Sequence, residues 1–388
     1  MRFPNIGSTV AAAALVAIAA VCATGPALAQ SKTIKIAVLT PLSGPGAYFG
    51  AQNKQGYELA LEQFKDGVGG VKFELSYEDS QCSPLAATQA IKRVLETVKP
   101  DIVFGEECSD ASLAILPTIT QAQIPLLNAG SSTAKLTNQN SRWVFRIFPD
   151  EVMQGESIAK NAYTRMKARK AVILHENTNA GIGNAAEFAR NFTAMGGEIV
   201  QRIGFDRTVN DFTPIATRIA GLGPVDVIPT YSLEGQGVRI TQALEQARVV
   251  RGGGGKAVQM GTIWLPAGFD EKAGKGAQGY VRIVQFDPEN KEPLVQNFVR
   301  AFRAKFGAER TPSHINAHAY DQVLLLADVV RRGGTDAKSI RDKLAETKNF
   351  RATTGIVNFD AKGQNTHPST MHYVETGADL KWKSLGWN

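Results

Sequence analysis

Short runs of β-branched and aliphatic residues alternate with longer segments of helical periodicity along most of this chain. The first run, residues 33–39, ends before Pro41 and Gly44 and predicts a strand. In the next segment, 55–64, apolar residues recur three and four positions apart, as one face of a helix requires. Strands separated by helix-length crossovers pair in parallel, and their helices then cover both faces of the sheet. The alternation therefore predicts an α/β protein.

The alternation falls into two series, which Pro149 separates. The first predicts strands at 33–39, 72–77, 101–104 and 125–127 and helices at 55–64, 84–98 and 111–121. The second predicts strands at 171–174, 198–203, 225–228 and 257–260 and helices near 151–168, 184–195, 211–220 and 234–249. Helices at 294–306 and 313–331 and strands near 355–359 and 370–374 are expected to follow. Each series is too short for one large sheet, so we expect two doubly wound lobes.

The N-terminal segment has the pattern of an export signal. A single arginine precedes an apolar run at 10–21, which is shorter than the about 20 residues of a membrane-spanning helix. Small residues then stand within 27–29, at the positions that a signal peptidase reads. We therefore expect residues 1–29 to be a cleaved signal peptide and the mature protein to be periplasmic. A lipid anchor at Cys22 is the alternative, but Val21 is not the small residue that such a site needs.

The loss of this segment would leave Cys82 and Cys108 as an even pair in an oxidising compartment, where a disulfide is the default. A pair of buried thiols is the alternative. The formal net charge of +7 is mild, and the Lys and Arg residues are scattered. Since no basic run with interleaved aromatic residues occurs, we expect no nucleic acid partner.

The loops after the predicted strands carry the residues of a small-molecule site. In open α/β sheets, ligands bind at the loops that leave the carboxyl ends of the strands. This rule selects 40–50, 105–112, 128–134 and 175–183, which are rich in glycine, serine, asparagine or aromatic residues. Such residues supply close backbone approach, hydrogen-bond donors and stacking faces.

Through these loops the chain resembles the periplasmic binding proteins of ABC importers for branched-chain amino acids, the leucine/isoleucine/valine-binding group. The similar segments, which keep the family's order and approximate spacing, are Leu42-Ser43-Gly44-Pro45 with Phe49-Gly50, Glu78-Asp79-Ser80-Gln81-Cys82, Gly105-Glu106-Glu107-Cys108-Ser109 and 128–137. The resemblance runs from about Lys32 to the C-terminus. It implies the type I periplasmic binding protein fold, with two Rossmann-like lobes joined by three crossovers. Lobe 1 would comprise 32–149 and 286–354, and lobe 2 would comprise 150–285 and 355–388.

The resemblance also implies where a ligand carboxylate would bind. In the family, the serine after the second cysteine and the turn after the next strand hold this group. The matching positions here are Ser109, Gly130, Ser131 and Ser132. Backbone N–H groups and hydroxyls near helix N-termini suit an anion. A helix N-cap is the other role open to Ser109.

The rest of the ligand would contact aromatic residues and lobe 2. In the family an aromatic of the first loop lies against the ligand side chain, and Tyr48 or Phe49 would do so here, unless it packs onto the following helix. On lobe 2 we expect contacts from Asn177, Tyr231 and Trp264.

Two departures from the family bear on the ligand. The lobe-2 glutamate that commonly pairs the ligand ammonium is missing, and Trp264 lies in that stretch; Ala180 replaces an aromatic residue. A desolvated ammonium without a counter-charge would cost several kcal/mol. We therefore expect an amino acid or related small carboxylate, with an aromatic or keto acid favoured over strict leucine/isoleucine/valine specificity. An amino acid stays open if Asp110 or Glu234 supplies the counter-charge.

Enzyme functions find weaker support. Gly181-Ile182-Gly183-Asn184-Ala185-Ala186 matches a dinucleotide-binding pattern, but His175 to Ala180 intervene where the turn should be tight. His314 and His318 have metal-ligand spacing without a base between them or a clear third ligand. No nucleophile-elbow motif occurs. We expect no enzyme activity, no cofactor and no metal.

A ligand sensor of the amide or urea type, built on the same fold, is a further alternative. Such sensors are usually fused to a DNA-binding or membrane segment, which this sequence does not show. We therefore favour a monomeric receptor that binds its ligand first on lobe 1 and then closes lobe 2 over it. Rotation would occur at crossovers near 149, 286 and 354. The closed form would dock on an ABC permease in the inner membrane.

Overall fold

The computed structural model describes residues 1, 32–139, 141–261, 268–367 and 371–386. Residues 33–388 form one unit of their own. Apart from Met1, the expected signal peptide lies outside the described residues, and so does Trp264. Among the helices that are described, none has the length and apolarity to cross a membrane.

The first sheet has five parallel strands in the order β2-β1-β3-β4-β5. They are β1 (Thr33–Thr40), β2 (Lys72–Asp79), β3 (Ile102–Gly105), β4 (Leu126–Asn128) and β5 (Val144–Arg146). Side chains alternate between two hydrophobic cores: Ile34 and Ile36 belong to one, Ala37 and Leu39 to the other. Both faces of the sheet are therefore buried, as expected for parallel strands.

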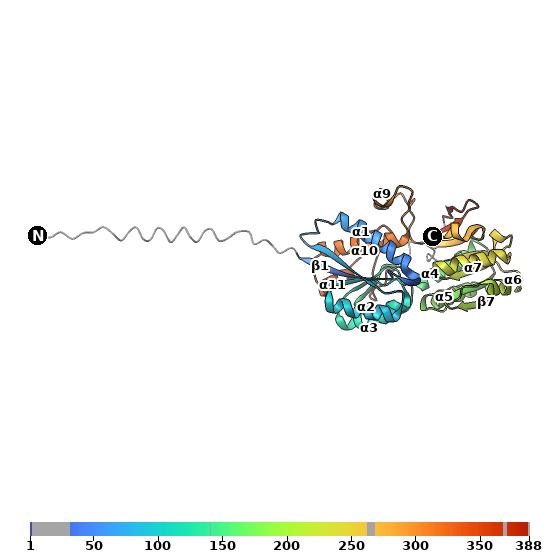
Figure 1. The fold of residues 1–388 in the computed structure, drawn as a ribbon, viewed down its shortest axis with the longest axis horizontal. Coiled ribbons are helices and arrows are strands. Elements are labelled where there is room, and N and C mark those ends of the chain that lie inside the picture. Colours follow the sequence, from blue (N-terminus) through green and yellow to red (C-terminus); the bar gives the residue numbers. More distant parts are fainter. Residues whose placement is uncertain (2–31, 140, 262–267, 368–370, 387–388) are drawn as a thin grey trace. The chain divides into compact units, whose positions relative to one another are not determined.

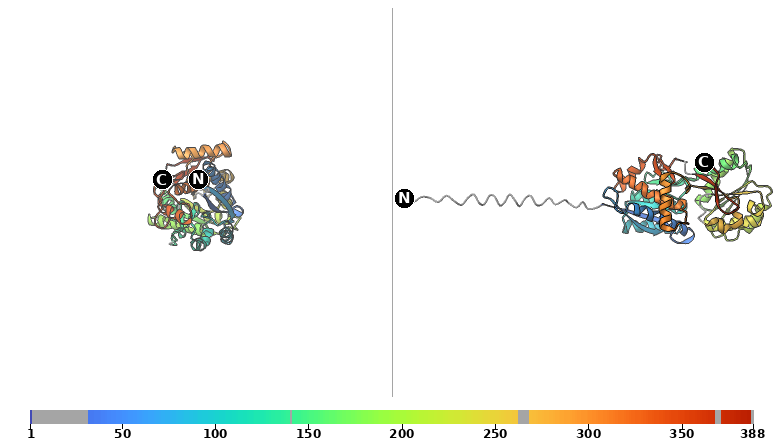
Figure 2. Two further views of the ribbon diagram at one scale, coloured as in Figure 1. Left: turned by 90° about the vertical axis from the view of Figure 1, so that its left-hand side faces the viewer. Right: turned by 90° about the horizontal axis from the view of Figure 1, so that it is seen from above.

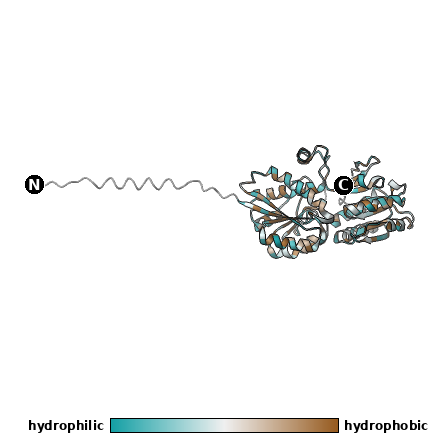
Figure 3. Ribbon diagram, viewed as in Figure 1, coloured by the Kyte–Doolittle hydropathy of each residue, from teal (hydrophilic) through white to brown (hydrophobic). Residues whose placement is uncertain are grey.

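Helices cover these two faces (Figure 1). On one face lie α2 (Pro84–Thr97) and α3 (Ser109–Ala122); on the other lie α1 (Ala47–Gln63), α9 (Pro293–Phe306), α10 (His314–Arg331) and α11 (Ala337–Ala345). Although α1 and α10 are far apart in the sequence, they lie side by side (Figure 2). Hydrophobic residues concentrate on the strands, and hydrophilic residues mark the outer helix faces (Figure 3).

The second sheet has seven strands in the order β14-β13-β10-β9-β8-β6-β7. The strands β6 (Lys170–Glu176), β7 (Glu198–Phe205), β8 (Val227–Tyr231), β9 (Val258–Gly261) and β10 (Val281–Val284) are parallel. The last two, β13 (His372–Thr376) and β14 (Trp382–Ser384), are antiparallel. The helices are α4 (Glu151–Thr164), α5 (Asn179–Ala194), α6 (Thr213–Ala220), α7 (Glu234–Gln246) and α8 (Phe269–Ala273). Helices α4 and α5 contribute to the core on one face, and α6 and α7 to the core on the other.

Two sequence expectations need correction. Helix α1 begins at Ala47, so Tyr48 and Phe49 lie in its first turn and not in a loop. The crossover expected near 354 comes later: β11 (Phe350–Ala352) and β12 (Gly355–Val357) pair with each other. Phe359 then packs in the core of the first sheet, with its ring 5.3 Å from that of Phe145. Apolar packing thus keeps residues 355–359 with the first sheet and not in lobe 2, which the family resemblance predicts for them.

A buried arginine joins the segments that leave the first sheet. Arg146 has no exposed surface. Its Nη1 donates to the carbonyls of Ser131 (3.1 Å) and Thr133 (2.6 Å), and its Nε donates to Gln364 Oε1 (2.7 Å). Its Nη2 lies 3.5 Å from Asp150 Oδ2. Burial lowers the Arg146 pKa to about 10, which still leaves the guanidinium charged at neutral pH.

Replacing this arginine with an apolar residue should destabilise the fold strongly. We expect Arg146→Met to lower the free energy of unfolding by about 3 kcal/mol, because the carbonyls of Ser131 and Thr133 would stay buried without a donor. Chemical denaturation measures this loss. Arg93→Met is the matched control, since Arg93 forms an exposed ion pair with Glu78, and its denaturation midpoint should stay near the wild-type value. Equal midpoints for the two variants would contradict the role of Arg146.

Candidate ligand-binding site

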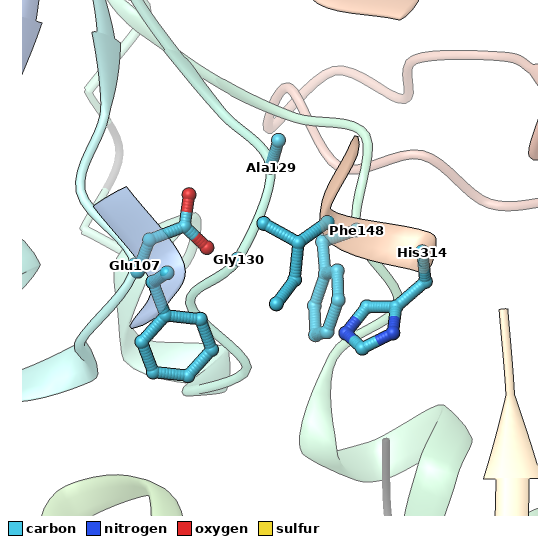
Figure 4. Close-up of a pocket in the computed structure, with 7 residues that line it drawn as sticks. Glu107, Ala129, Gly130, Phe148 and His314 are labelled. Atoms are coloured by element: carbon cyan, nitrogen blue, oxygen red, sulfur yellow. The ribbon is translucent and has the colours of Figure 1, made fainter. Parts of the chain in front are cut away.

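The strand orders define where a ligand crevice should lie. Order reverses between β1 and β3 in the first sheet and between β6 and β8 in the second. Ligands of doubly wound sheets bind outside the carboxyl ends of the strands at such switch points. Each switch point has a cavity beside it. The first cavity is lined by Phe49, Glu107, Ala129, Gly130, Phe148, His314 and Ile315 (Figure 4). The second cavity is lined by Glu176, Thr178, Ala180, Gly181, Asn184, Tyr231 and Ser232.

Contacts between the two lobes bring these cavities to one cleft. Asn184 Nδ2, at the second cavity, donates to Ser132 Oγ at 3.2 Å. Asn179 Nδ2 donates to Asp110 Oδ1 at 2.5 Å. The structure therefore holds the cleft in a closed arrangement.

Apolar packing also crosses the cleft. Leu233, which follows β8, packs with Phe49 of α1 and Ile315 of α10. Tyr48 is partly buried against the same cluster, with its ring 4.1 Å from that of Phe49. Of the two aromatic residues predicted for this region, only Phe49 is a lining residue of the first cavity.

The predicted serines are brought together at the ends of β3 and β4. Ser109, Ser131 and Ser132 are almost completely buried. Ser109 Oγ accepts from Ser131 Oγ (3.1 Å) and from Thr133 N (3.3 Å). Ser109 is not the N-cap of α3, because that position is Cys108.

The serine hydroxyls remain capable of donation. A hydroxyl carries one donor and two acceptor sites, and the bonds described above use Ser109 and Ser132 as acceptors. By contrast, the backbone N–H groups of Gly130 and Ser131 already donate to Asn128 Oδ1, at 3.3 and 3.0 Å. The donors available to an anion are therefore hydroxyls more than backbone amides. The N-terminus of α3, which begins at Ser109, adds a favourable dipole.

A glutamate lines the first cavity. Glu107 is 4% exposed, and its Oε1 accepts from Asn53 Nδ2 at 2.8 Å. Its other oxygen lies against Gly130, where an added Cβ would approach Oε2 to 1.7 Å. Position 130 therefore requires glycine as long as Glu107 keeps this position. Burial raises the Glu107 pKa to about 7, against the opposing effect of the Asn53 hydrogen bond.

Other titratable groups near the cleft are also perturbed by burial. The pKa of Glu106 is raised to about 8 and that of Glu151 to about 7, in both cases mainly by desolvation. Desolvation lowers the pKa of His314 to about 3 and that of His318 to about 4, so both rings are neutral. The part of the chain that the structure describes holds no cluster of His, Cys, Asp and Glu that could bind a metal ion.

The lobe-2 predictions have mixed outcomes. Tyr231 lines the second cavity and is buried. Asn177 lines neither cavity, because its side chain turns to Asp206 and donates to Oδ1 at 2.8 Å. The neighbouring residues that line the second cavity are Thr178, the N-cap of α5, and Asn184, within that helix. The side chain of Glu234 and all of Trp264 lie outside what the structure describes.

Sequence reasoning missed several lining residues. Glu176 and Ser232 end or follow strands beside the switch point, so the strand-end rule could have identified them. Glu176 is already satisfied within lobe 2: Oε2 lies 3.1 Å from Arg207 Nε, and Oε1 accepts from Leu233 N. Phe148 and His314 had no such signal, because they come from a crossover and from the start of α10.

The predicted disulfide between Cys82 and Cys108 is confirmed, with the two Cα atoms 5.3 Å apart. It fastens the loop after β2 to the loop that carries Glu107 and leads into α3 at Ser109. Arg207 of the second lobe donates to the Cys82 carbonyl at 3.3 Å, so this link also meets the opposite lobe.

Comparisons with known proteins agree with this architecture. A family model described as periplasmic binding protein matches residues 33–379. The leucine-, isoleucine-, valine-, threonine- and alanine-binding protein of Pseudomonas aeruginosa is 26% identical over 336 residues, which cover 85% of this chain and 87% of that protein. The branched-chain amino acid transporter substrate-binding protein LivJ of Streptococcus pneumoniae, solved with isoleucine, has a TM-score of 0.81 at 26% identity and covers 91% of this chain and 98% of its own. A solute-binding protein of R. palustris, solved with benzoate, has a TM-score of 0.82 at 22% identity over 91% of this chain and 96% of its own, which shows the fold alone.

The buried carboxyls predict a stability that declines as the pH rises. The pKa values of Glu106 and Glu107 are raised in the fold, to about 8 and about 7, so the unfolded chain releases protons that the fold retains. Their stabilising contribution is complete at low pH and is lost as the pH passes 7 to 8. The buried histidines, whose pKa values are lowered in the fold, change the stability only below about pH 6.5, where the unfolded chain takes up protons that the fold does not. We therefore expect the melting temperature of the ligand-free protein to fall between pH 6.5 and 8.5.

Glu107→Gln should make this fall smaller, because it removes one of the titrating groups and keeps the Oε1 acceptor for Asn53. Glu309→Gln is the control, since Glu309 is exposed and should leave the pH profile unchanged. A profile of Glu107→Gln that parallels the wild type would contradict the buried ionisation of Glu107.

Proposed function

The chain belongs to the periplasmic binding protein family, and on this basis we propose that it is the substrate-binding protein of an ABC importer. Its fold is the type I fold of that family, with two doubly wound lobes joined by three crossovers. Members of the family are transport proteins and not enzymes. We further propose that residues 1–29 direct the chain to the periplasm, where it would bind its ligand and deliver it to a permease in the inner membrane.

The paired serine hydroxyls carry the proposal about the ligand. Ser109 and Ser132 are buried at the cleft, and each accepts hydrogen bonds while its own hydrogen remains available. Two such donors beside the N-terminus of α3 favour an anion, and a carboxylate fits two hydroxyls. Of the related proteins described above, the Pseudomonas aeruginosa protein is named for the amino acids it binds and LivJ was solved with isoleucine, and amino acids carry this group. We therefore propose an amino acid or a related small carboxylate as the ligand class.

Hinge closure is the proposed mechanism. The ligand would bind first to lobe 1, through Ser109 and the turn from Gly130 to Ser132. Lobe 2 would then close, and the bonds from Asn184 to Ser132 and from Asn179 to Asp110 would form. Tyr231 and Trp264 are the proposed lobe-2 contacts.

Removal of both hydroxyls should abolish most of the affinity. A hydrogen bond to a charged group contributes roughly 1.5–3 kcal/mol, so the double variant Ser109→Ala/Ser132→Ala should bind at least about 100-fold more weakly. The ligand can be identified by mass spectrometry of what copurifies with the protein, and its affinity measured by calorimetry. Thr217→Ala removes an exposed hydroxyl of α6 and should have no effect. Unchanged affinity in the double variant would refute the carboxylate assignment.

The bond between Asp110 and Asn179 should contribute to closure, because it joins the two lobes. Asp110→Ala removes the acceptor for Asn179 across the cleft, and a net loss of about 1 kcal/mol corresponds to about five-fold weaker binding. Asp206→Ala is the matched control, because it removes an asparagine–aspartate bond that lies within lobe 2. Calorimetry should separate the two variants, and small-angle scattering should show a more open ligand-free form for Asp110→Ala. Equal affinities would contradict the proposed contribution of this contact to closure.

A further inference from the structure

The first cavity has apolar walls and a single acidic group. Phe49, Phe148 and Ile315 are buried lining residues, and Ala129 adds a small apolar surface. Figure 4 shows Glu107 on one side of the cavity and the rings of Phe148 and His314 on the other. In a cavity that receives a purely aliphatic or aromatic ligand end, a carboxyl is unfavourable, because the carboxyl would lose water and gain no partner when the ligand binds.

The hydrogen bonds of Glu107 leave acceptor capacity at the cavity. Oε1 accepts from Asn53 Nδ2, and Asn53 is itself fixed by a second bond to Thr40 Oγ1 at 3.1 Å. Oε2 lies above Gly130, which has no side chain to cover it. Among the ion pairs of the described residues, none pairs Glu107 with a lysine or arginine.

The neighbours of Glu107 do not supply the missing donor. Glu106 points its Oε1 at the backbone N–H of Cys108, at 2.7 Å. The phenol of Tyr57 donates to Gln322 Oε1 at 2.6 Å. His314 is neutral, since burial lowers its pKa to about 3, so it offers no cation. Its ring keeps one N–H donor, but among the hydrogen bonds of the described residues none joins His314 to Glu107.

We propose that Glu107 is a specificity-determining residue that accepts a hydrogen bond from the far end of the ligand. The proposal rests on the function proposed above. The ligand would then be a carboxylate whose other end carries an N–H or O–H donor, in place of a plain leucine-like or phenyl end. The serines would hold one end and Glu107 the other, with Gly130 between them: Gly130 precedes the serine pair in the turn and contacts the Glu107 carboxyl.

A purely structural role for Glu107 would predict a different arrangement. If Glu107 served only as the acceptor for Asn53, protein atoms would be expected to cover its second oxygen. Instead, Oε2 lies against Gly130, which lines the cavity and has no room for a side chain. A site built to pair a donor rejects analogues that lack it far more strongly than an apolar pocket rejects an added methylene. The proposal therefore predicts discrimination that depends on Glu107.

Matched pairs of carboxylates test the proposal by calorimetry. The probes are phenylacetate with 4-hydroxyphenylacetate and hexanoate with 6-aminohexanoate, so that each pair differs only in the donor at the far end. The wild-type protein should bind the donor-bearing member of at least one pair about 100-fold or more tightly. In Glu107→Leu this preference should disappear or reverse, because the donor would then lack an acceptor and the plain end would meet an apolar wall.

Further variants separate the possible outcomes. Glu107→Gln keeps the shape and the acceptor for Asn53 but replaces Oε2 with an NH2 donor. It tests the proposal even if Glu107→Leu does not fold: it should retain a hydroxyl-bearing ligand, whose oxygen can accept a hydrogen bond, and lose an ammonium-bearing one. Glu151→Gln changes a buried glutamate that does not line the first cavity and should leave every ratio unchanged. Equal ratios in the wild type and both Glu107 variants would overturn this inference alone. Absence of binding for every carboxylate, in the wild type and all variants, would overturn the receptor function as well.

Discussion

The guanidinium of Arg146 is removed from water completely, and its charge must therefore be satisfied by the protein. Its five donors lie in a rigid fork, which fixes the partners in space relative to one another. Those partners are the carbonyls of Ser131 and Thr133 and groups of two crossovers, Asp150 and Gln364. The position of the turn that presents Ser131 and Ser132 is thus coupled to the segments along which the chain passes between the sheets. Any rotation at these crossovers must keep the partners of Arg146 together. The crossover segments that carry Asp150 and Gln364 should therefore move as one piece with the turn that carries Ser131 and Ser132.

The contacts that hold the cleft closed are of a different kind. They are single polar bonds, such as Asn184 to Ser132 and Asn179 to Asp110, and a small apolar cluster around Leu233. A typical neutral hydrogen bond contributes about 1 kcal/mol net, because open lobes would bond to water instead. Closure by these contacts alone is therefore only weakly favoured, and a ligand that touches both lobes can shift the population decisively. The stronger links are of two kinds: the Cys82–Cys108 disulfide joins two loops of lobe 1, and Arg146 joins the turn at 131–133 to the crossovers.

Much of the fold could be predicted from the sequence, because parallel strands and their helices leave separate periodicities. The strand-end rule and the family resemblance also predicted Tyr231, which lines the second cavity, and three serines at 109, 131 and 132, which lie at the ends of β3 and β4 but line neither cavity. The failures have local physical causes. His314 lines the first cavity through the packing of α10 against α1, which no periodicity reports. Asn177 lies in the correct loop, but a hydrogen bond to Asp206 turns its side chain away. The direction of a loop side chain depends on partners that are distant in sequence, and a strand-end rule contains no such information.

Glu107 shows how a binding site can be missed even beside a residue that was identified. It lies two positions before Ser109, in a segment that resembles the family. From the sequence alone, however, a glutamate is most often a solvated surface group. Its importance depends on Gly130, which lies on another strand's loop and leaves room for the carboxyl. The same turn that places the serine hydroxyls thus also admits the glutamate. A cleft that presents both hydroxyl donors and a buried acceptor is electrostatically asymmetric, and it should orient its ligand as well as select it.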